Sequence, residues 1–492
     1  MLRDLIKKEL LKITGLAEVK LAEPEREEHG DYTTNVAFKM GPPAGGAEEI
    51  AEKLRKSELV KEVAVKNKFI NIFLKDEGLL KALEEKIHPP QFSEKKFGRV
   101  NVEFVSANPT GPLTMANARG GFYGDALSNV LEKTGYDVTR EFYINDAGNQ
   151  VKLLGESIQA AEGKIPEKDE YYKGEYIKKL KGKTAQEAVE VLLGEIKSSL
   201  EKAGVKFGVW FSENEKLRKT GELDAVLKKF KTEKRDGAVW FASPAGEWVL
   251  VKSDGEATYF LADLAYHYDK FFKRKFDLAI DVWGADHAGH IERLKKGMAA
   301  LGVNSDRLKI IIVQLVRLVS DGKEARMSKR TGEFVTMDEL LEQVGLDAAR
   351  WFFLARAPET HMDFDLDLAK ERSEKNPVYY VQYAHTRMAS ILSKAQNTKY
   401  KILNTFAHPS ERALVVKILR YPELLEDISK DYQVHRLTTY AYELAQSFSA
   451  FYRDVKVLGS EREAELLYLV QKAKETLADL LKLMGISPPE KM

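Results

Sequence analysis

The chain has 492 residues, of which 44% are hydrophobic and 31% charged, and it contains no cysteine. That length suffices for roughly two to four domains, each with its own core, and the missing thiols exclude disulfides and cysteine-ligated zinc. The net charge of +1 argues against a dominant nucleic-acid-binding surface, so any RNA contact must come from a local arrangement of side chains.

Residues 1–92 are predicted to form a small α+β module that ends near Pro89-Pro90. Helical patterns over 1–12 and 47–58 flank a Gly/Pro-rich loop at 41–46, and 69–74 reads as a strand. The first residues form a charged amphipathic helix without the apolar core of a signal peptide, and no apolar run approaches the roughly twenty residues of a membrane span. We therefore expect a cytoplasmic protein without a membrane segment.

Strand-like and helical stretches alternate from 93 to 370, as a parallel sheet covered by helices requires. Residues 276–283 and 309–316 read as core strands. The stretch from about 151 to 250 is charged and largely helical, with a β-like patch near 237–251, and looks inserted between two halves of the sheet. From 371 to 492 the pattern is nearly all helix, which predicts a helical bundle appended to an α/β core.

The loop at 107–117 follows a predicted strand at 100–105 and precedes a predicted helix at 115–133. A strand–loop–helix unit points free backbone N–H groups and the positive end of the helix at its ligand, which suits a phosphate. Thr114 and Asn117 are three residues apart, so both can face that ligand from the first helical turn. The plain alternative is an ordinary βα connection with a helix cap.

A basic segment, Arg326-Met-Ser-Lys-Arg330, lies between two glycines and is able to fold over a polyphosphate, although alone such a segment is usually solvated surface. Together with the first loop it resembles the two-part signature of class I aminoacyl-tRNA synthetases, a His-x-Gly-His-type helix start and a Lys-Met-Ser-Lys-type loop. Within that class the chain is most similar to arginyl-tRNA synthetases. The segments that carry this resemblance are 30–36, 102–113, 142–150, 258–263, 284–287, 364–368 and 376–385.

The resemblance implies an α/β fold with a Rossmann-like parallel-sheet class I synthetase core at 93–370. An N-terminal α+β module that contacts tRNA would precede this core, and an all-α anticodon-binding bundle would follow it. The implied reaction is the ATP-dependent ligation of L-arginine to tRNA(Arg) through an arginyl-adenylate. The implied enzyme is a monomer that uses ATP with Mg²⁺, held mostly by phosphate oxygens and water, and no zinc.

For adenylate formation, the resemblance assigns catalytic phosphate contacts to Thr114 and Asn117 on one side and to Ser328 and Lys329 on the other. Donors that meet the charge developing on the phosphates supply most of such catalysis. The residues expected to bind ATP are Pro109, Gly111, Thr114, Ala116, Asn117, Arg326, Met327, Ser328 and Lys329.

The helix start Thr114-Met-Ala-Asn117 departs from the family, which usually has His-x-Gly-His there. Related tryptophanyl enzymes often have Thr-x-Gly-Asn, so Thr and Asn can supply neutral donors. Ala116 adds a methyl group where the family's glycine lets adenine lie against the helix. Slower activation is one expectation, and a catalytically impaired or non-catalytic tRNA- or arginine-binding relative is the alternative. The helical tail disfavours a third reading, an adenylating enzyme that acts without tRNA.

Arginine selection is expected to depend on carboxylates, because a guanidinium is best held by a planar pair of oxygens. The resemblance assigns Glu103, Tyr259 and Asp263 to the guanidinium end, Asn108 to the α-amino or carboxylate end, and His290 to a further substrate contact. Without the resemblance, Tyr259 and Asp263 read as a helix-surface pair and Glu103 as a charge at a strand edge. The run from Asp286 to His290 also admits a metal site, but further ligands are missing nearby in the sequence.

Transfer RNA recognition is expected at both ends of the chain. Tyr380, Tyr383 and Arg387 share one helical face, and aromatic rings beside an arginine make a stacking platform for unpaired bases. The resemblance places anticodon contacts at these positions and contacts with the tRNA elbow at Tyr32 and Asn35. The alternative for the first three is a buried aromatic stripe that joins the bundle to the core.

Overall fold

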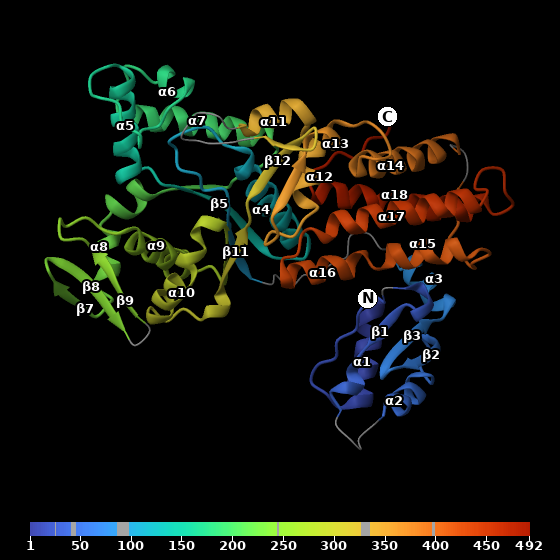
Figure 1. The fold of residues 1–492 in the computed structure, drawn as a ribbon. Coiled ribbons are helices and arrows are strands. Elements are labelled where there is room, and N and C mark those ends of the chain that lie inside the picture. Colours follow the sequence, from blue (N-terminus) through green and yellow to red (C-terminus); the bar gives the residue numbers. More distant parts are fainter. Residues whose placement is uncertain (25, 41–45, 86–97, 244–245, 326–334, 396–398) are drawn as a thin grey trace.

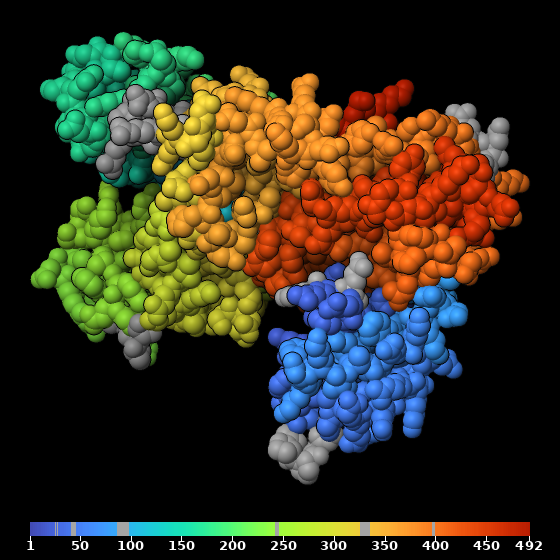
Figure 2. Space-filling view, turned by 45° about the vertical axis from the view of Figure 1, so that its right-hand side comes forward, coloured from blue at the N-terminus to red at the C-terminus, as the bar shows by residue number. Residues whose placement is uncertain are grey.

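The structure is a computed structural model that describes residues 1–492 apart from 25, 41–45, 86–97, 244–245, 326–334 and 396–398 (Figure 1). Along the chain, a small α+β module is followed by a region built on a parallel sheet and then by a helical bundle. In Figure 2 the blue module projects from the orange and red helices of the bundle, apart from the green part of the sheet region.

The N-terminal module packs helices on a three-stranded antiparallel sheet with the order β1-β3-β2. Its elements are α1 (Leu2–Thr14), β1 (Tyr32–Thr34), α2 (Ala47–Leu54), β2 (Val60–Lys66), β3 (Phe69–Leu74) and α3 (Asp76–Glu84). The predicted helices near 1–12 and 47–58 and the strand at 69–74 are confirmed, although α2 ends before 58. The sequence does not predict β2, because a bulge between Val60 and Glu62 interrupts its alternation.

The central sheet has five parallel strands in the order β11-β10-β4-β5-β6. They are β4 (Arg99–Glu103), β5 (Asp137–Ile144), β6 (Val209–Ser212), β10 (Leu278–Gly284) and β11 (Leu308–Val313). The chain runs from β4 outward to β6 and then returns to place β10 on the other side of β4. In open parallel sheets, ligands bind outside the carboxyl ends of the strands at such a reversal, so the order itself points to the ends of β4 and β10.

Helices and a small sheet surround this core. Between β4 and β6 lie α4 (Met115–Lys133), α5 (Asn149–Ala161), α6 (Glu175–Lys179) and α7 (Ala185–Lys202). Between β6 and β11 lie η3 (Asn214–Arg218), α8 (Glu222–Leu227), β7 (Thr232–Arg235), β8 (Ala238–Ser243), β9 (Gly246–Val251), α9 (Tyr259–Tyr268), η4 (Asp269–Lys273), η5 (Ala285–His290) and α10 (Ile291–Ala300).

Two expectations for this region need correction. The stretch 151–250 is not wholly an insertion, because β6 lies inside it and pairs with β5. The predicted strand at 309–316 is two strands, β11 and β12 (Val316–Ser320), which belong to different sheets. The chain turns between them at Gln314, whose backbone N–H donates to the carbonyl of Pro358 at 2.8 Å.

A second small sheet, with the order β13-β12-β14, leads into the bundle. Its strands β13 (Lys323–Ala325) and β14 (Met362–Asp365) accompany α11 (Met337–Val344), α12 (Leu346–Leu354) and α13 (Leu366–Lys370). The bundle consists of α14 (Pro377–Lys394), α15 (Pro409–Leu419), α16 (Tyr421–Asp431), α17 (Arg436–Asp454) and α18 (Glu463–Leu483). Among the helices of the described ranges, none is long and apolar enough to cross a membrane.

Helix α4 connects the sheet to the bundle. Tyr123 donates its hydroxyl to the carbonyl of Tyr432 at 2.6 Å. The guanidinium of Arg350, on α12, is buried and donates to the Asp125 carboxylate of α4 at 2.8 Å and to the carbonyl of Met484 at 2.9 Å. The helix that follows the predicted phosphate loop is therefore bonded directly to the C-terminal domain.

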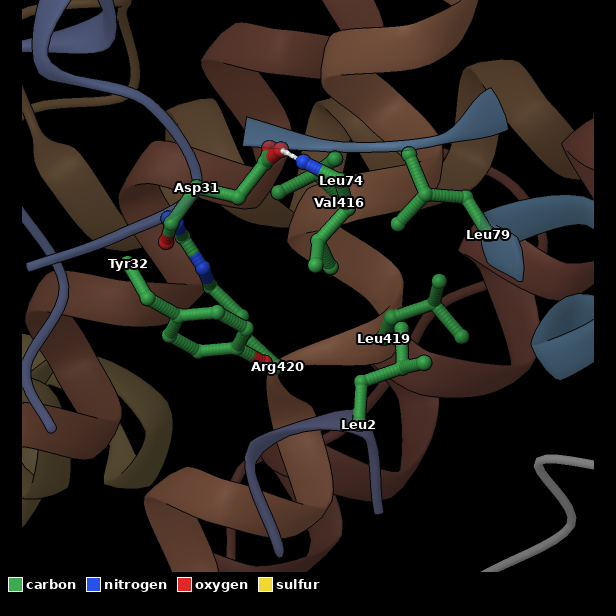
Figure 3. Close-up of a pocket in the computed structure, with 8 residues that line it drawn as sticks. All are labelled: Leu2, Asp31, Tyr32, Leu74, Leu79, Val416, Leu419 and Arg420. Atoms are coloured by element: carbon green, nitrogen blue, oxygen red, sulfur yellow. Dashed lines mark hydrogen bonds between the residues drawn. The ribbon is translucent and has the colours of Figure 1, made fainter. Parts of the chain in front are cut away.

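The N-terminal module docks on the bundle through partly buried ion pairs. Arg3 lies 2.6 Å from both the Glu426 and the Asp427 carboxylates, and Arg412 donates to Asp31 at 2.8 Å. A small pocket lies in this interface (Figure 3), lined by Leu2, Asp31, Tyr32, Leu74, Leu79, Val416, Leu419 and Arg420. These charged contacts hold the module against α15 and α16.

Candidate active site and RNA-binding surfaces

The backbone turns sharply at the end of β4. Val105 and Ser106 both adopt the left-handed conformation, with φ of 67° and 37°, which is rare for residues other than glycine and especially for a β-branched one. Gly124 of α4 permits the turn, because a Cβ there would overlap the ring of Phe104. The predicted strand at 100–105 consequently ends at Glu103, and its terminal carboxylate lies at the start of the loop.

At the start of α4, Thr114 and Asn117 contact each other. The Oδ1 of Asn117 accepts from the backbone N–H of Thr114 at 2.9 Å and from its hydroxyl at 3.0 Å. Thr114 and Asn117 form a capping box, so the helix cap of the plain alternative is present. The amide Nδ2 of Asn117 has no hydrogen-bond partner among the described residues, and the side chain is half-buried. Nδ2 is therefore available as a donor to a ligand.

The other residues expected to bind ATP differ in their exposure. Pro109 is buried, Gly111 is half-buried and Ala116 is exposed on the first turn of α4. Arg326, Met327, Ser328 and Lys329 lie outside the described residues, so their roles stay predictions.

Three polar side chains from separate segments meet at the loop that follows β4. Asn145, at the end of β5, donates to the Oδ1 of Asn108 at 3.1 Å and also to the hydroxyl of Tyr259 on α9. Asn108 and Tyr259 are exposed while Asn145 is buried. The sequence therefore identified two members of this trio and missed the residue that joins them, although Asn145 lies in one of the segments that carry the resemblance.

Asp263 lies one turn after Tyr259 on α9 and is half-buried. Its carboxylate has no hydrogen-bond partner among the described residues. Burial raises the pKa of the Asp263 carboxyl to about 7, with Glu103 and Glu213 adding to the rise and His267 opposing it. A desolvated carboxylate without a hydrogen-bonded cation is the arrangement that a guanidinium would stabilise.

Glu103, in contrast, already has a cationic partner. Its Oε2 accepts from the Nζ of Lys270 at 2.9 Å, and its Oε1 accepts from the hydroxyl of Ser106 at 2.9 Å. The same ammonium donates to Asp281 at 2.7 Å, and Asp281 lies opposite Glu103 in the register of β10 and β4. Sequence reasoning missed Lys270, although Asp263 and Lys270 are seven residues apart and hence share a helical face.

His290 is exposed at the end of η5, where its Nδ1 contacts the guanidinium of Arg293. The rings of His287 and His290 lie 6.2 Å apart. Across the described ranges, no three side chains of His, Asp or Glu are grouped so as to hold a metal ion. His290 lies beyond the end of β10, and its substrate contact stays a prediction.

One face of α14 carries the predicted anticodon contacts. Tyr383 is 42% exposed, and its hydroxyl accepts from Arg387 at 2.8 Å. The guanidinium of Arg387 also lies 4.8 Å from the ring centre of Tyr452 on α17. Tyr380 is half-buried, with its ring 5.1 Å from that of Tyr442. Tyr380 is therefore partly packed, as the alternative of a buried aromatic stripe requires, whereas Tyr383 and Arg387 are exposed and do not fit that alternative.

Of the two residues predicted to contact the tRNA elbow, the structure buries one and exposes the other. Tyr32 is only 4% exposed and donates its hydroxyl to Glu423 at 2.7 Å, so its side chain is part of the interface with the bundle (Figure 3). Asn35 is exposed and remains a candidate. The exposed aromatic pair is Phe38 and Phe69, with ring centres 5.5 Å apart. Lys68 lies 5.7 Å from the Phe38 ring centre.

Comparison with known proteins connects these features. Residues 1–74 match the family described as arginyl tRNA synthetase N terminal domain, 79–170 match tRNA synthetases class I (R), catalytic domain, and 381–492 match the DALR anticodon binding domain. An arginine–tRNA ligase of Heliobacterium modesticaldum is 40% identical over 95% of this chain and 93% of the relative. One from Bacillus licheniformis is 39% identical over 100% of this chain and 99% of the relative.

The fold agrees with these matches. The structure of Thermus thermophilus arginyl-tRNA synthetase has a TM-score of 0.82 and 24% identity, and the alignment covers 100% of both chains. The parallel core with its reversal at β4 and β10, the module before it and the bundle after it are thus the arrangement of a class I synthetase. By sequence identity over nearly its full length, this chain belongs to the arginyl-tRNA synthetase family, the class I ligases that join arginine to tRNA.

Proposed function

We propose that the ends of β4 and β10 bind L-arginine and ATP, and that the chain joins arginine to tRNA(Arg) through an arginyl-adenylate. The observation that carries this proposal is the convergence of Asp263, Tyr259 and Asn108 beside the first turn of α4. Asp263 offers the guanidinium a carboxylate whose pKa is raised by burial and that has no hydrogen-bond partner among the described residues. Asn108 and Tyr259, linked by Asn145, would orient the rest of the amino acid.

The phosphate end of the site would use the start of α4. The free amide of Asn117 and the backbone N–H groups of the first turn can donate to ATP, and Mg²⁺ would arrive with the nucleotide as part of the substrate. Attack of the arginine carboxylate on the α-phosphorus then needs only in-line positioning and donors for the developing charge. Ser328 and Lys329 are proposed to complete those donors from the opposite side.

Two exposed aromatic surfaces are proposed to bind tRNA. Tyr383 and Arg387 on α14 would stack on unpaired bases of the anticodon loop. On the module, Phe38 and Phe69 with Lys68 replace Tyr32 as the proposed contact, because their rings are 55% and 44% exposed and a neighbouring cation favours an RNA backbone. We also propose that the protein acts as a monomer in the cytoplasm.

Aminoacylation of total tRNA with labelled arginine tests the proposed function directly. The expected result is arginine attached to tRNA with the consumption of ATP, and no labelling with lysine or citrulline. A protein that binds arginine and tRNA but forms neither adenylate nor ester would instead be the non-catalytic relative that the substituted helix start leaves open.

A further inference from the structure

Three carboxylates form a row across the sheet. Glu141 on β5, Glu103 on β4 and Asp281 on β10 occupy matching register positions on adjacent parallel strands. Side chains at matching positions of parallel strands point to the same face, so all three project together. All three are buried, with exposed fractions of 0%, 6% and 0%. Three buried anions side by side require cations from the element that covers them.

That element is the end of α9 together with η4. Arg274, which follows η4, donates to Glu141 at 3.0 Å. Lys270 donates to Glu103 at 2.9 Å and to Asp281 at 2.7 Å, and His267 lies 2.6 Å from the other oxygen of Asp281. Each carboxylate of the row therefore has a basic partner from residues 267–274.

Lys270 differs from its neighbours in its burial and in its position. Its side chain is 0% exposed and its ammonium lies between two carboxylates. On the same helical face, about two and three turns earlier, lie Asp263 and Tyr259 of the proposed arginine site. Lys270 donates to the Oε2 of Glu103. The other oxygen, Oε1, accepts from Ser106 and is the one left for a further partner such as a guanidinium.

We propose that Lys270 is a positioning residue for arginine selection, which keeps Glu103 ionised and turns its Oε1 toward the guanidinium. The proposal rests on the proposed placement of arginine at Glu103. A carboxyl group that is fully desolvated beside a second carboxylate favours its protonated form, and a protonated Glu103 would offer the guanidinium no charge. The ammonium of Lys270 opposes both the desolvation and the repulsion from Asp281, because it donates a hydrogen bond of 2.9 Å to Glu103.

The charges that face Glu103 support this role. His267 and Asp263 come from α9, Lys270 from η4 and Asp281 from β10, and the neutral hydroxyl of Ser106 comes from the loop. Burial raises the pKa of Glu103 and Asp281 adds to the rise, whereas Lys270 and His267 lower it. Without Lys270, the remaining neighbours leave burial as the dominant influence, so Glu103 would ionise only at higher pH.

The test measures the KM for arginine of Lys270→Met and of the parent at a series of pH values. The quantity compared is the ratio of the variant's KM to the parent's KM at each pH. At about pH 6.5 we expect the ratio to be at least about tenfold, and to fall as the pH rises toward about 9, because Glu103 then ionises without help. The KM for ATP should not change. Lys273→Met is the matched control, since Lys273 lies three residues later on η4, is 43% exposed and pairs with Glu222 instead; its ratio should stay near one.

The outcomes separate the inference from the function on which it rests. If Glu103→Gln leaves arginine use unaltered, arginine does not bind at Glu103 and the placement fails. If Glu103→Gln weakens arginine use but the Lys270→Met ratio is near one, or is raised equally at every pH, Lys270 has only a structural role. Should Lys270→Met not fold, Lys270→Met/Asp281→Asn removes the cation together with one carboxylate and is judged by the same pH trend.

Discussion

Replacing Asn117 with aspartate separates two functions that one side chain combines. The Oδ1 of Asn117 accepts two hydrogen bonds from Thr114, at 2.9 and 3.0 Å, while its Nδ2 is the donor proposed for ATP. Asn117→Asp keeps an oxygen acceptor at the same place but replaces the amide donor with a negative charge. The helix cap should survive and the phosphate contact should not.

The two functions differ in magnitude. Loss of a helix cap typically destabilises a protein by about 0.5–2 kcal/mol, and an acidic residue in the first turn is favourable, so Asn117→Asp should unfold at nearly the parent temperature. Loss of one preorganised donor slows catalysis by about 10²–10³-fold, or about 2.7–4 kcal/mol, and repulsion from the phosphates adds to that loss. Asn117→Ala removes both functions and should show both effects.

Arginine-dependent exchange of pyrophosphate into ATP, with tRNA present, measures activation, and thermal unfolding measures the cap. We expect slow exchange at a normal melting temperature for Asn117→Asp. Exchange at the parental rate in that variant would refute the role of Nδ2 and return Asn117 to a structural cap. A parent without detectable exchange at saturating ATP, arginine and tRNA would support the non-catalytic alternative.

Three further predictions address arginine, tRNA and the joint between domains. Asp263→Asn should raise the KM for arginine at least about tenfold; because the carboxyl pKa is raised to about 7, the parental KM should rise as the pH falls through 7, and this dependence should disappear in the variant. Tyr383→Ala/Arg387→Ala should weaken tRNA binding by about 1–3 kcal/mol per unstacked base at an unchanged melting temperature, and a lower melting temperature with normal binding would favour a packing role. Arg350→Met should lower the free energy of unfolding in urea by about 3–5 kcal/mol, because it leaves Asp125 buried without its close partner; a loss below about 1 kcal/mol would contradict this.

The arrangement of the core could be predicted from local patterns. Alternating strands and helices indicate a parallel sheet, and the residues at the end of β4 and the start of α4 carry the features that bind phosphate in such sheets. Asn145 links Asn108 to Tyr259, and Asp263, one turn after Tyr259, is close enough to Glu103 for their charges to interact. Their proposed roles rest on residue types and spacings that persist after folding, namely a strand end and two positions one helical turn apart.

Other features depend on contacts that no local pattern contains. Lys270 reads as an ordinary charge in the basic run that follows α9, and only the register of β4 against β10 places Glu103 and Asp281 on either side of it. Tyr32 reads as an exposed aromatic residue, but the docking of the module on α16 buries it. Position in the tertiary structure decides whether a polar residue is solvated, bound to a substrate or paired.

The backbone around the substituted helix start supports the proposal that Thr114 and Asn117 take the place of the family's two histidines. Residues 335–337, which follow the basic segment, are bonded to α4: Met115 donates to the carbonyl of Val335 at 3.2 Å, and Met337 donates to that of Leu113 at 2.9 Å. Thr336 caps α11 with Glu339, as Thr114 caps α4 with Asn117. Asn117 closes the first turn of α4 by accepting from Thr114, beside the backbone bonds from residues 335–337. The amide that is proposed to donate to ATP is therefore held on a turn fixed by Thr114 and by the backbone of residues 335–337, and this proposed role requires a free Nδ2 rather than an imidazole.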